Sequence, residues 1–183
     1  SFDKIRDIMG DFINLIQKRR SCRKFAEGDI SADNVQLILR AALMSPSSRN
    51  RQLWEFVVVD DGILLDKLAD SKETGAQFLR QSAFAVVVLG NPADNDCWIE
   101  DGSIAAYSMQ LQAEDLGLGS CWAQMRGRSL SDGTSADDVI HGILEIPAEM
   151  KVLCVIGFGQ KGNACSLRDE DTLKWENVHI NKY

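Results

Sequence analysis

Histidine, proline and paired cysteines are scarce in this 183-residue chain. It has two histidines, three prolines and no Cys-x-x-Cys pair, so a metal site has few ligands to build on. The five cysteines are odd in number and widely spaced, which argues for reduced thiols and against a disulfide framework. We therefore expect no bound metal and a cytoplasmic protein.

Excess positive charge and long apolar runs are also missing. Twenty basic and twenty-seven acidic side chains leave a net charge of −7, so binding to a phosphate backbone has no cationic driving force. The apolar run over residues 83–89 is far shorter than the roughly 20 residues that span a bilayer. We expect neither a nucleic-acid nor a membrane partner, and the length suits one domain with a sizeable core.

The spacing of apolar residues predicts helices that alternate with four strands. Ser31 and Ser135 are expected to cap two of the helices, and Gly117 and Gly119 are expected to end the longest one in left-handed conformations. Since the strands are nearly all apolar, they predict a sheet covered on both faces, in an α+β or α/β fold. Helices are predicted over 11–20, 32–44, 63–70, 98–116 and 135–144, strands over 54–60, 83–90, 120–125 and 151–159, and a loop over 21–29.

A literal G-x-G-x-x-G follows the last predicted strand, at Gly157, Gly159 and Gly162. A dinucleotide fingerprint needs a helix directly after the glycines and then a returning strand. Only 21 residues follow Gly162, and they contain no amphipathic helix at that point. We interpret the glycines as the exit of a core strand, followed by a polar tail that reaches away from its own domain.

The stretch "RRSCRKF" gathers three arginines and a serine at the predicted end of the first helix. Guanidinium groups bind phosphate oxygens in a bidentate manner, and a serine hydroxyl adds a short donor. A solvated basic helix end would carry the same residues.

A second polar stretch, "SPSSRNRQLWEF", precedes the first predicted strand. Its serines, Asn50 and Gln52 could recognise hydroxyl groups and ring heteroatoms, although an ordinary turn has the same composition.

Together with a helix that ends in "LGLGSCW" and a strand that ends in "IGFG", these two stretches form an ordered set. The set resembles the nitroreductase family of flavin enzymes over nearly the whole chain, from Arg19 to about Gly159. The resemblance implies an α+β three-layer sandwich, with a central, mostly antiparallel sheet flanked by helices, in an intertwined homodimer. Residues 1–183 would form a single domain, in which about 160–183 are a C-terminal extension packed on the partner subunit.

The resemblance further implies that FMN lies at the dimer interface. Arg19, Arg20 and Ser21 would hold the ribityl phosphate, and Arg23 would lie by the pyrimidine side of the flavin. The backbone of Ala123 to Met125 would face the flavin N5. In that segment, Gln124 and Met125 are the implied cofactor contacts. A second phosphate cation would come from Arg168, or alternatively from Lys174. The partner chain would contribute Pro46, Ser47, Ser48 and Asn50.

The implied reaction is ping-pong: NADH or NADPH gives hydride to FMN N5, and a small oxidant such as a nitroaromatic or quinone then takes the electrons. Because the cofactor carries this chemistry, no side chain is expected to be catalytic. Cys22 and Cys121 flank the implied flavin segments and are expected to be small packing residues. The alternatives are a flavin-binding or sensor protein of this fold without nicotinamide turnover, or another flavin reaction such as dehydrogenation or dehalogenation.

Overall fold

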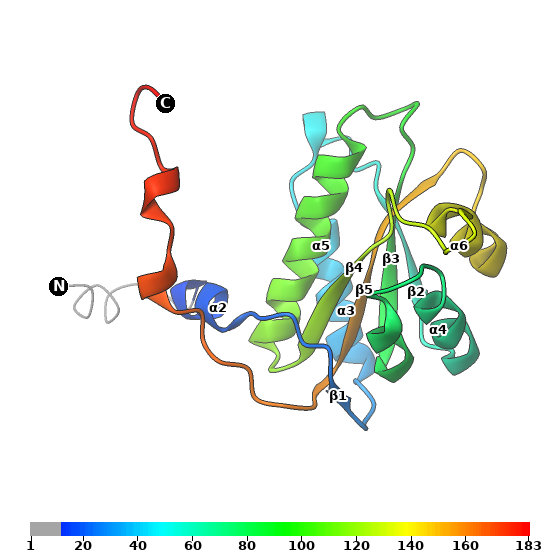
Figure 1. Cartoon of the computed structure of the whole chain (residues 1–183), viewed down its shortest axis with the longest axis horizontal. Coiled ribbons are helices and arrows are strands. Elements are labelled where there is room, and N and C mark those ends of the chain that lie inside the picture. The colour runs from blue at the N-terminus through cyan, green and yellow to red at the C-terminus, as the bar shows by residue number, and fades with distance from the viewer. Residues whose placement is uncertain (1–11) are drawn as a thin grey trace.

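A five-stranded sheet forms the centre of the computed structural model, which describes residues 12–183 (Figure 1). Residues 1–11, among them the first residue of the helix expected over 11–20, lie outside the described residues. The α-helices are α2 (Phe12–Lys18), α3 (Ala32–Leu43), α4 (Gly62–Ala69), α5 (Trp98–Asp115) and α6 (Ala136–Leu144). The strands are β1 (Phe25–Ala26), β2 (Glu55–Val59), β3 (Phe84–Gly90), β4 (Gly119–Gln124) and β5 (Lys151–Lys161).

The long strand β5 organises the sheet. One edge of β5 pairs with β3, which in turn pairs with β2, and the opposite edge pairs with β4. Strand β1 pairs with Gln160 and Lys161 at the end of β5. Every one of these pairings is antiparallel. The antiparallel sheet expected from the family resemblance is therefore confirmed.

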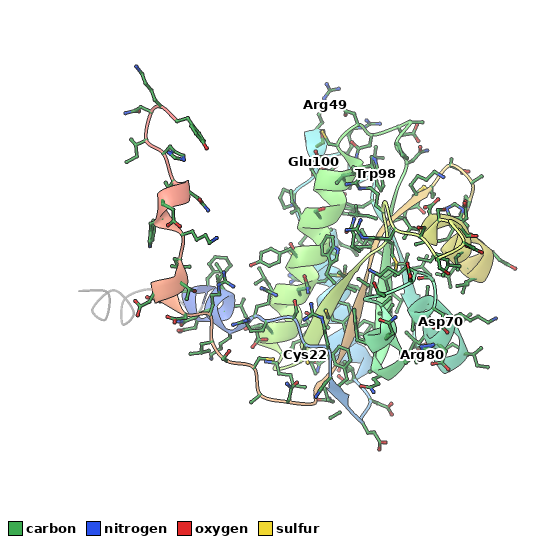
Figure 2. All side chains as sticks on the ribbon, in the orientation of Figure 1. Cys22, Arg49, Asp70, Arg80, Trp98 and Glu100 are labelled. Atoms are coloured by element: carbon green, nitrogen blue, oxygen red, sulfur yellow. The ribbon has the colours of Figure 1, made fainter. Side chains whose placement is uncertain are left out.

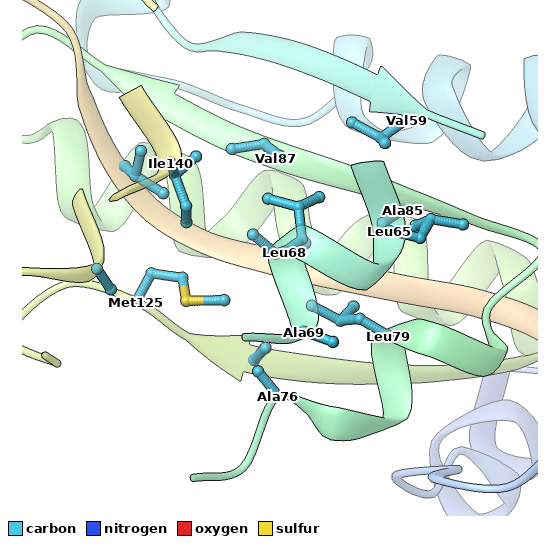
Figure 3. Packing of buried hydrophobic residues seen from close by; sticks show 14 of the residues in the cluster. Val59, Leu65, Leu68, Ala69, Ala76, Leu79, Ala85, Val87, Met125 and Ile140 are labelled. Carbon is cyan, nitrogen blue, oxygen red and sulfur yellow. The ribbon is translucent and has the colours of Figure 1, made fainter. Parts of the chain in front are cut away.

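Helices cover both faces of the sheet, as the apolar strands predict (Figure 1). On one face α3 and α5 pack over a core that contains Ile38, Met109 and Phe158, all fully buried. On the other face α4, α6 and the 3-10 turn η2 (Gln77–Gln81) pack over a second core, shown in Figure 3. The fold is thus a three-layer α+β sandwich, which confirms the fold class that the family resemblance implies.

Local sequence signals place most helix ends. The Ser31 and Ser135 side chains accept hydrogen bonds from the amides of Asn34 (3.2 Å) and Asp138 (3.0 Å), as expected of N-caps. Gly117 has a left-handed φ of 74°, as expected at the end of α5. The expectation for Gly119 is wrong, because this residue is already part of β4 and its φ is not positive.

Two further features were not expected from the sequence. Strand β1 lies inside the segment predicted to be a loop, and its two residues pair with Gln160 and Lys161. Strand β5 consequently continues past Gly159 to Lys161. A two-residue strand has no periodicity of its own, so only its pairing with β5 reveals it.

The C-terminal segment and α2 extend from one side of the sandwich (Figure 1). After β5 the chain has two single 3-10 turns, η3 (Glu170–Thr172) and η4 (Trp175–Asn177), and no α-helix. Two hydrogen bonds join this segment to α2: the Arg168 amide donates to the Gln17 carbonyl at 2.9 Å, and Gln17 Nε2 donates to the Arg168 carbonyl at 3.1 Å. Within residues 12–183, no helix has the length and apolarity to cross a bilayer, and no group of three or more His, Cys, Asp or Glu residues could hold a metal ion.

Candidate functional site

The segment that follows α2 lies along the start of β4. Ser21 and Ser120 form a parallel bridge, and the Cys22 amide donates to the Ser120 carbonyl at 2.9 Å. The Cys22 side chain is 2% exposed and points into the core, as expected of a packing residue. Burial of Cys22 anchors the segment, so its neighbours Ser21 and Arg23 remain exposed at the surface.

An open pocket of about 380 Å³ brings the predicted arginines together. Arg20 is held there by its Nη1, which donates to the carbonyls of Ser166 (3.1 Å) and Leu167 (3.4 Å). Arg168 reaches the same pocket from the C-terminal segment, whereas Lys174 does not line it. The lining residues are Arg19, Arg20, Ser21, Arg23, Asn163, Ala164, Cys165, Ser166 and Arg168.

This arginine pocket, as we call it, is strongly cationic in a chain of net charge −7. Four of its nine lining residues are arginines, and none is acidic. The Nε of Arg19 is buried and has no hydrogen-bond partner within residues 12–183. Guanidinium groups around a concave surface with no carboxylate among its lining residues are suited to a phosphate group, which offers several oxygens to planar donors.

The outer edge of β4 continues from this pocket. Along an antiparallel strand, backbone groups point alternately toward the paired strand and away from it. The Ser120 carbonyl accepts from Cys22, on the side away from β5, while the Met125 amide donates to Leu153 on the β5 side at 3.3 Å. By this alternation, the backbone N–H groups of Trp122 and Gln124 face outward.

Only part of the predicted segment 123–125 therefore offers an outward amide. The Gln124 N–H faces the open edge, but the Met125 amide is bonded to Leu153. The Met125 side chain is 1% exposed and packs in the core (Figure 3). Its sulfur accepts from the Ser71 hydroxyl at 3.6 Å. The Gln124 side chain bonds to Trp122 Nε1 and to the Arg126 carbonyl, both at 3.0 Å.

Cations lie beside the same edge. Burial raises the pKa of the Cys121 thiol, while the charge of Arg23 and a hydrogen bond with Ser21 act in the opposite direction. Lys72, which is 8% exposed, donates from Nζ to the Gln124 carbonyl at 2.7 Å. Burial, and secondly the charge of Arg128, lowers the pKa of Lys72. The edge thus combines an outward amide with two nearby cationic side chains.

Sequence reasoning did not identify Lys72 or the residues around it. A second pocket of about 400 Å³ shares Arg23 with the arginine pocket and is also lined by Lys24, Gly75, Gln77, Phe78 and Gln81. Residues 72–77 form a polar stretch without periodicity, so no sequence signal distinguishes them from an ordinary loop.

The predicted loop over residues 46–50 lies far from the arginine pocket of the same chain. The Ser48 amide donates to Asp101 in the first turn of α5 at 2.9 Å, whereas Ser21 and Cys22 contact Ser120, just beyond the end of α5. Asp101 and Asp115 are fourteen residues apart in this helix, or about 21 Å. Figure 2 shows Arg49 and Cys22 near opposite ends of α5. One chain therefore does not bring the two predicted segments into a single site.

The glycines of the G-x-G-x-x-G stretch have a packing role. A Cβ on Gly159 would lie 2.7 Å from Cδ1 of Phe25, and a Cβ on Gly162 would lie 2.7 Å from the Lys24 carbonyl oxygen. Gly159 and Gly162 thus allow the close crossing of the 24–25 segment over β5, whereas Gly157 makes room for Ser82 and Leu79. As predicted, no helix comes directly after these glycines: residues 162–169 are irregular, and only the 3-10 turns η3 and η4 follow.

Comparison with known proteins agrees with this architecture. A profile of the nitroreductase family matches residues 16–88 and 70–160. The chain belongs to the nitroreductase family.

Individual relatives match over nearly their whole length. A protein of Archaeoglobus fulgidus, provisionally named NADH dehydrogenase/NAD(P)H nitroreductase, is 29% identical over 180 residues, which cover 96% of this chain and 100% of the relative. The solved structure of an FMN-dependent nitroreductase from Clostridium difficile R20291 matches with a TM-score of 0.91 at 39% identity, over 93% of this chain and 99% of that one. A Bacteroides thetaiotaomicron structure, provisionally named like the archaeal relative, matches with a TM-score of 0.86 at 28% identity, over 96% and 99%.

Proposed function

We propose that this protein is an FMN-dependent oxidoreductase that takes reducing equivalents from NADH or NADPH and passes them to a nitroaromatic, a quinone or a similar small oxidant. The observation that carries the proposal is the arginine pocket, with four guanidinium groups and no carboxylate. The names of the relatives, FMN-dependent nitroreductase and NAD(P)H nitroreductase, support the same cofactor and electron donor.

The residues present fit FMN in two parts. The buried, unpartnered Nε of Arg19 and the exposed Ser21 hydroxyl are suited to the phosphate, together with Arg20 and Arg168. At the adjoining edge of β4, Arg23 and the outward Gln124 amide are suited to the polar edge of the flavin ring. Pocket and edge are contiguous through Ser21, which bridges to Ser120 of β4.

A homodimer would complete the site, because the loop over residues 46–50 lies at the opposite end of α5 from the arginine pocket of its own chain (Figure 2). Pro46, Ser47, Ser48 and Asn50 would then approach the cofactor that the partner subunit holds. Apolar side chains on the projecting segments support a large interface, since Trp175 is 68% and Ile180 is 82% exposed in the single chain. We propose that the segment from about residue 160 to 183 packs on the partner subunit.

Bound FMN would supply the two-electron chemistry, and the chain's own residues would set its electrostatics. Reduction of a flavin adds negative charge near its pyrimidine ring, and the fixed Arg23 guanidinium would stabilise that charge. The outward Gln124 N–H would donate a hydrogen bond to the ring. No side chain is required as an acid or base, so we assign no catalytic residue.

The test is the absorbance spectrum of the purified protein, before and after reconstitution with FMN. We expect flavin bands, anaerobic bleaching on addition of NADH or NADPH, and recovery of the bands when a nitroaromatic or a quinone is added. A protein that does not take up FMN would overturn the proposal. A protein that binds FMN but is reduced by neither nicotinamide would be a flavin-binding protein without this activity.

A further inference from the structure

Asp101 is a buried carboxylate at the junction of three segments. It lies in the first turn of α5, is 4% exposed, and forms no ion pair with any residue among 12–183. Its Oδ1 accepts from the Ser48 amide and its Oδ2 from Asn95 Nδ2, each at 2.9 Å. Asn95 is 5% exposed, and its Oδ1 accepts from the Cys97 amide at 3.0 Å. Desolvating a carboxylate is costly, so these donors compensate the buried charge.

The loop that Asp101 holds is strained. Arg49, Asn50 and Gln52 have φ values of 52°, 53° and 54°, a left-handed region that residues with a Cβ adopt infrequently. Such conformations persist only where the surrounding structure determines them, and they are enriched at functional sites. Within the loop, the Gln52 amide donates to Ser47 Oγ at 2.9 Å. The bond from Ser48 to Asp101 fastens the loop to the rigid body of the protein.

We propose that Asp101 is a positioning residue for the cofactor of the partner subunit. It fixes the strained loop over residues 46–52 in the conformation that meets an FMN bound in the other chain's arginine pocket. This inference rests on the proposed function, because it requires FMN and an interface at which the two segments meet. It goes beyond the proposed function, because it gives Asp101, which does not contact the cofactor, an effect on the FMN affinity of the partner subunit.

A single exchange of the carboxylate tests the hydrogen-bond network. In Asp101→Asn, the new NH2 group would face the Asn95 NH2 group, unless one amide turns and gives up its bond to a backbone amide. We expect FMN to bind at least about tenfold more weakly, an effect typical of an unsatisfied buried polar group. The measurement is titration of the apoprotein with FMN, followed by quenching of flavin fluorescence.

A double exchange, Asn95→Asp combined with Asp101→Asn, restores the network with its polarity reversed. The side-chain NH2 group introduced at position 101 can donate to the carboxylate introduced at position 95, which still accepts from the Cys97 amide. The side-chain oxygen at position 101 still accepts from the Ser48 amide, and the number of buried charges is unchanged. We expect the FMN affinity to recover most of its loss relative to Asp101→Asn, and failure to recover would overturn the role of this network.

Mixed dimers test the effect across the interface. A dimer of one Arg19→Ala chain and one Asp101→Asn chain has one site in which both the arginine pocket and the loop are wild type. Heterodimers purified through two different affinity tags should bind FMN with wild-type affinity at half the sites, although both homodimers bind weakly. This recovery requires a folded Asp101→Asn chain, so misfolding cannot mimic it.

The outcomes separate the two proposals. If the wild type takes up no FMN, the proposed function and this inference both fall. If the wild type binds FMN but Asp101→Asn binds it equally well, or mixed dimers recover no site, only the positioning role of Asp101 is overturned.

Discussion

The Nζ of Lys72 donates to the carbonyl oxygen of Gln124 at 2.7 Å, so a buried cation holds the last peptide of β4. Lys72 comes from the polar segment after α4, and its charge lies beside the outward amide that we assign to the flavin ring. Burial lowers the pKa of Lys72, with a further contribution from Arg128. The cost of burying this charge makes the stability of the protein depend on pH.

Lys72→Met should remove that dependence. Because the folded-state pKa lies below the ordinary value of 10.5, the unfolded chain binds more protons between the two values, and the free energy of unfolding rises with pH in that window. Urea unfolding at several pH values up to about 9 should show that the stability of wild type relative to Lys72→Met increases with pH. A difference that stays constant would contradict the prediction.

Two details make this comparison clean. Cys154 has a pKa raised by burial and therefore lowers the stability above pH 9.0 equally in both proteins. The pKa of Cys121 is also raised by burial, but the Cys121 thiolate interacts with Lys72, so the comparison of the two proteins rests on the pH values below 9.0. Lys67→Met is the matched control, because Lys67 is exposed on α4 and the substitution leaves the buried edge of β4 unchanged.

Arg19 and Arg23 should affect FMN in different ways. Arg19→Ala removes from the arginine pocket a guanidinium whose Nε is buried and unpartnered within residues 12–183, and should weaken FMN binding by about 10- to 100-fold, as expected for lost charge-assisted hydrogen bonds. Arg23→Ala should instead lower the flavin reduction potential and slow reduction by NADH or NADPH, while weakening FMN retention less. Spectroelectrochemistry and fluorescence titration separate the two effects. An unchanged potential in Arg23→Ala would show that this guanidinium does not face the flavin.

Arg168, and not Lys174, should supply the phosphate cation of the C-terminal segment. Arg168 lines the arginine pocket and is joined to α2 through Gln17, whereas Lys174 lies beyond η3 and outside the pocket. Arg168→Ala should therefore weaken FMN binding by about tenfold or more, and Lys174→Ala should leave it near the wild-type value. Titrations at low and high salt provide the check, because a lost phosphate contact also reduces the salt dependence. The opposite ranking would indicate that Lys174 reaches the phosphate.

The sequence predicts the layers of this fold well because its buried strands are nearly continuous apolar runs. Strand β3, for example, is buried along its whole length, and its sequence is unambiguous. Strand β1 could not be predicted in the same way, since its two residues acquire their conformation only by pairing with Gln160 and Lys161. Long-range pairing, unlike periodicity, leaves no local signature.

The candidate site likewise combines residues that the sequence reveals with residues that only the folded chain brings together. The cluster of arginines at 19–23 is visible in the sequence, and the structure adds Arg168 to it across more than 140 residues. Which of Ala123, Gln124 and Met125 offers an outward amide could not be predicted, because a shift of one residue in the pairing of β4 with β5 would exchange the two sides. No sequence signal identifies Lys72, because its role depends on its burial and on its hydrogen bond to the Gln124 carbonyl in the folded chain.

Gly159→Ala distinguishes packing from phosphate binding as the reason for the glycine-rich stretch. An added Cβ would lie 2.7 Å from Cδ1 and 2.8 Å from Cγ of Phe25, a buried side chain with little room to move. Overpacking of this kind should destabilise the protein by about 1–3 kcal/mol in urea unfolding. Gly142→Ala is the control: a Cβ there meets nothing within 4 Å, and alanine within α6 should add about 0.5–1 kcal/mol of stability. If the glycines instead cradled a phosphate, Gly159→Ala would abolish FMN binding and leave the unfolding free energy unchanged.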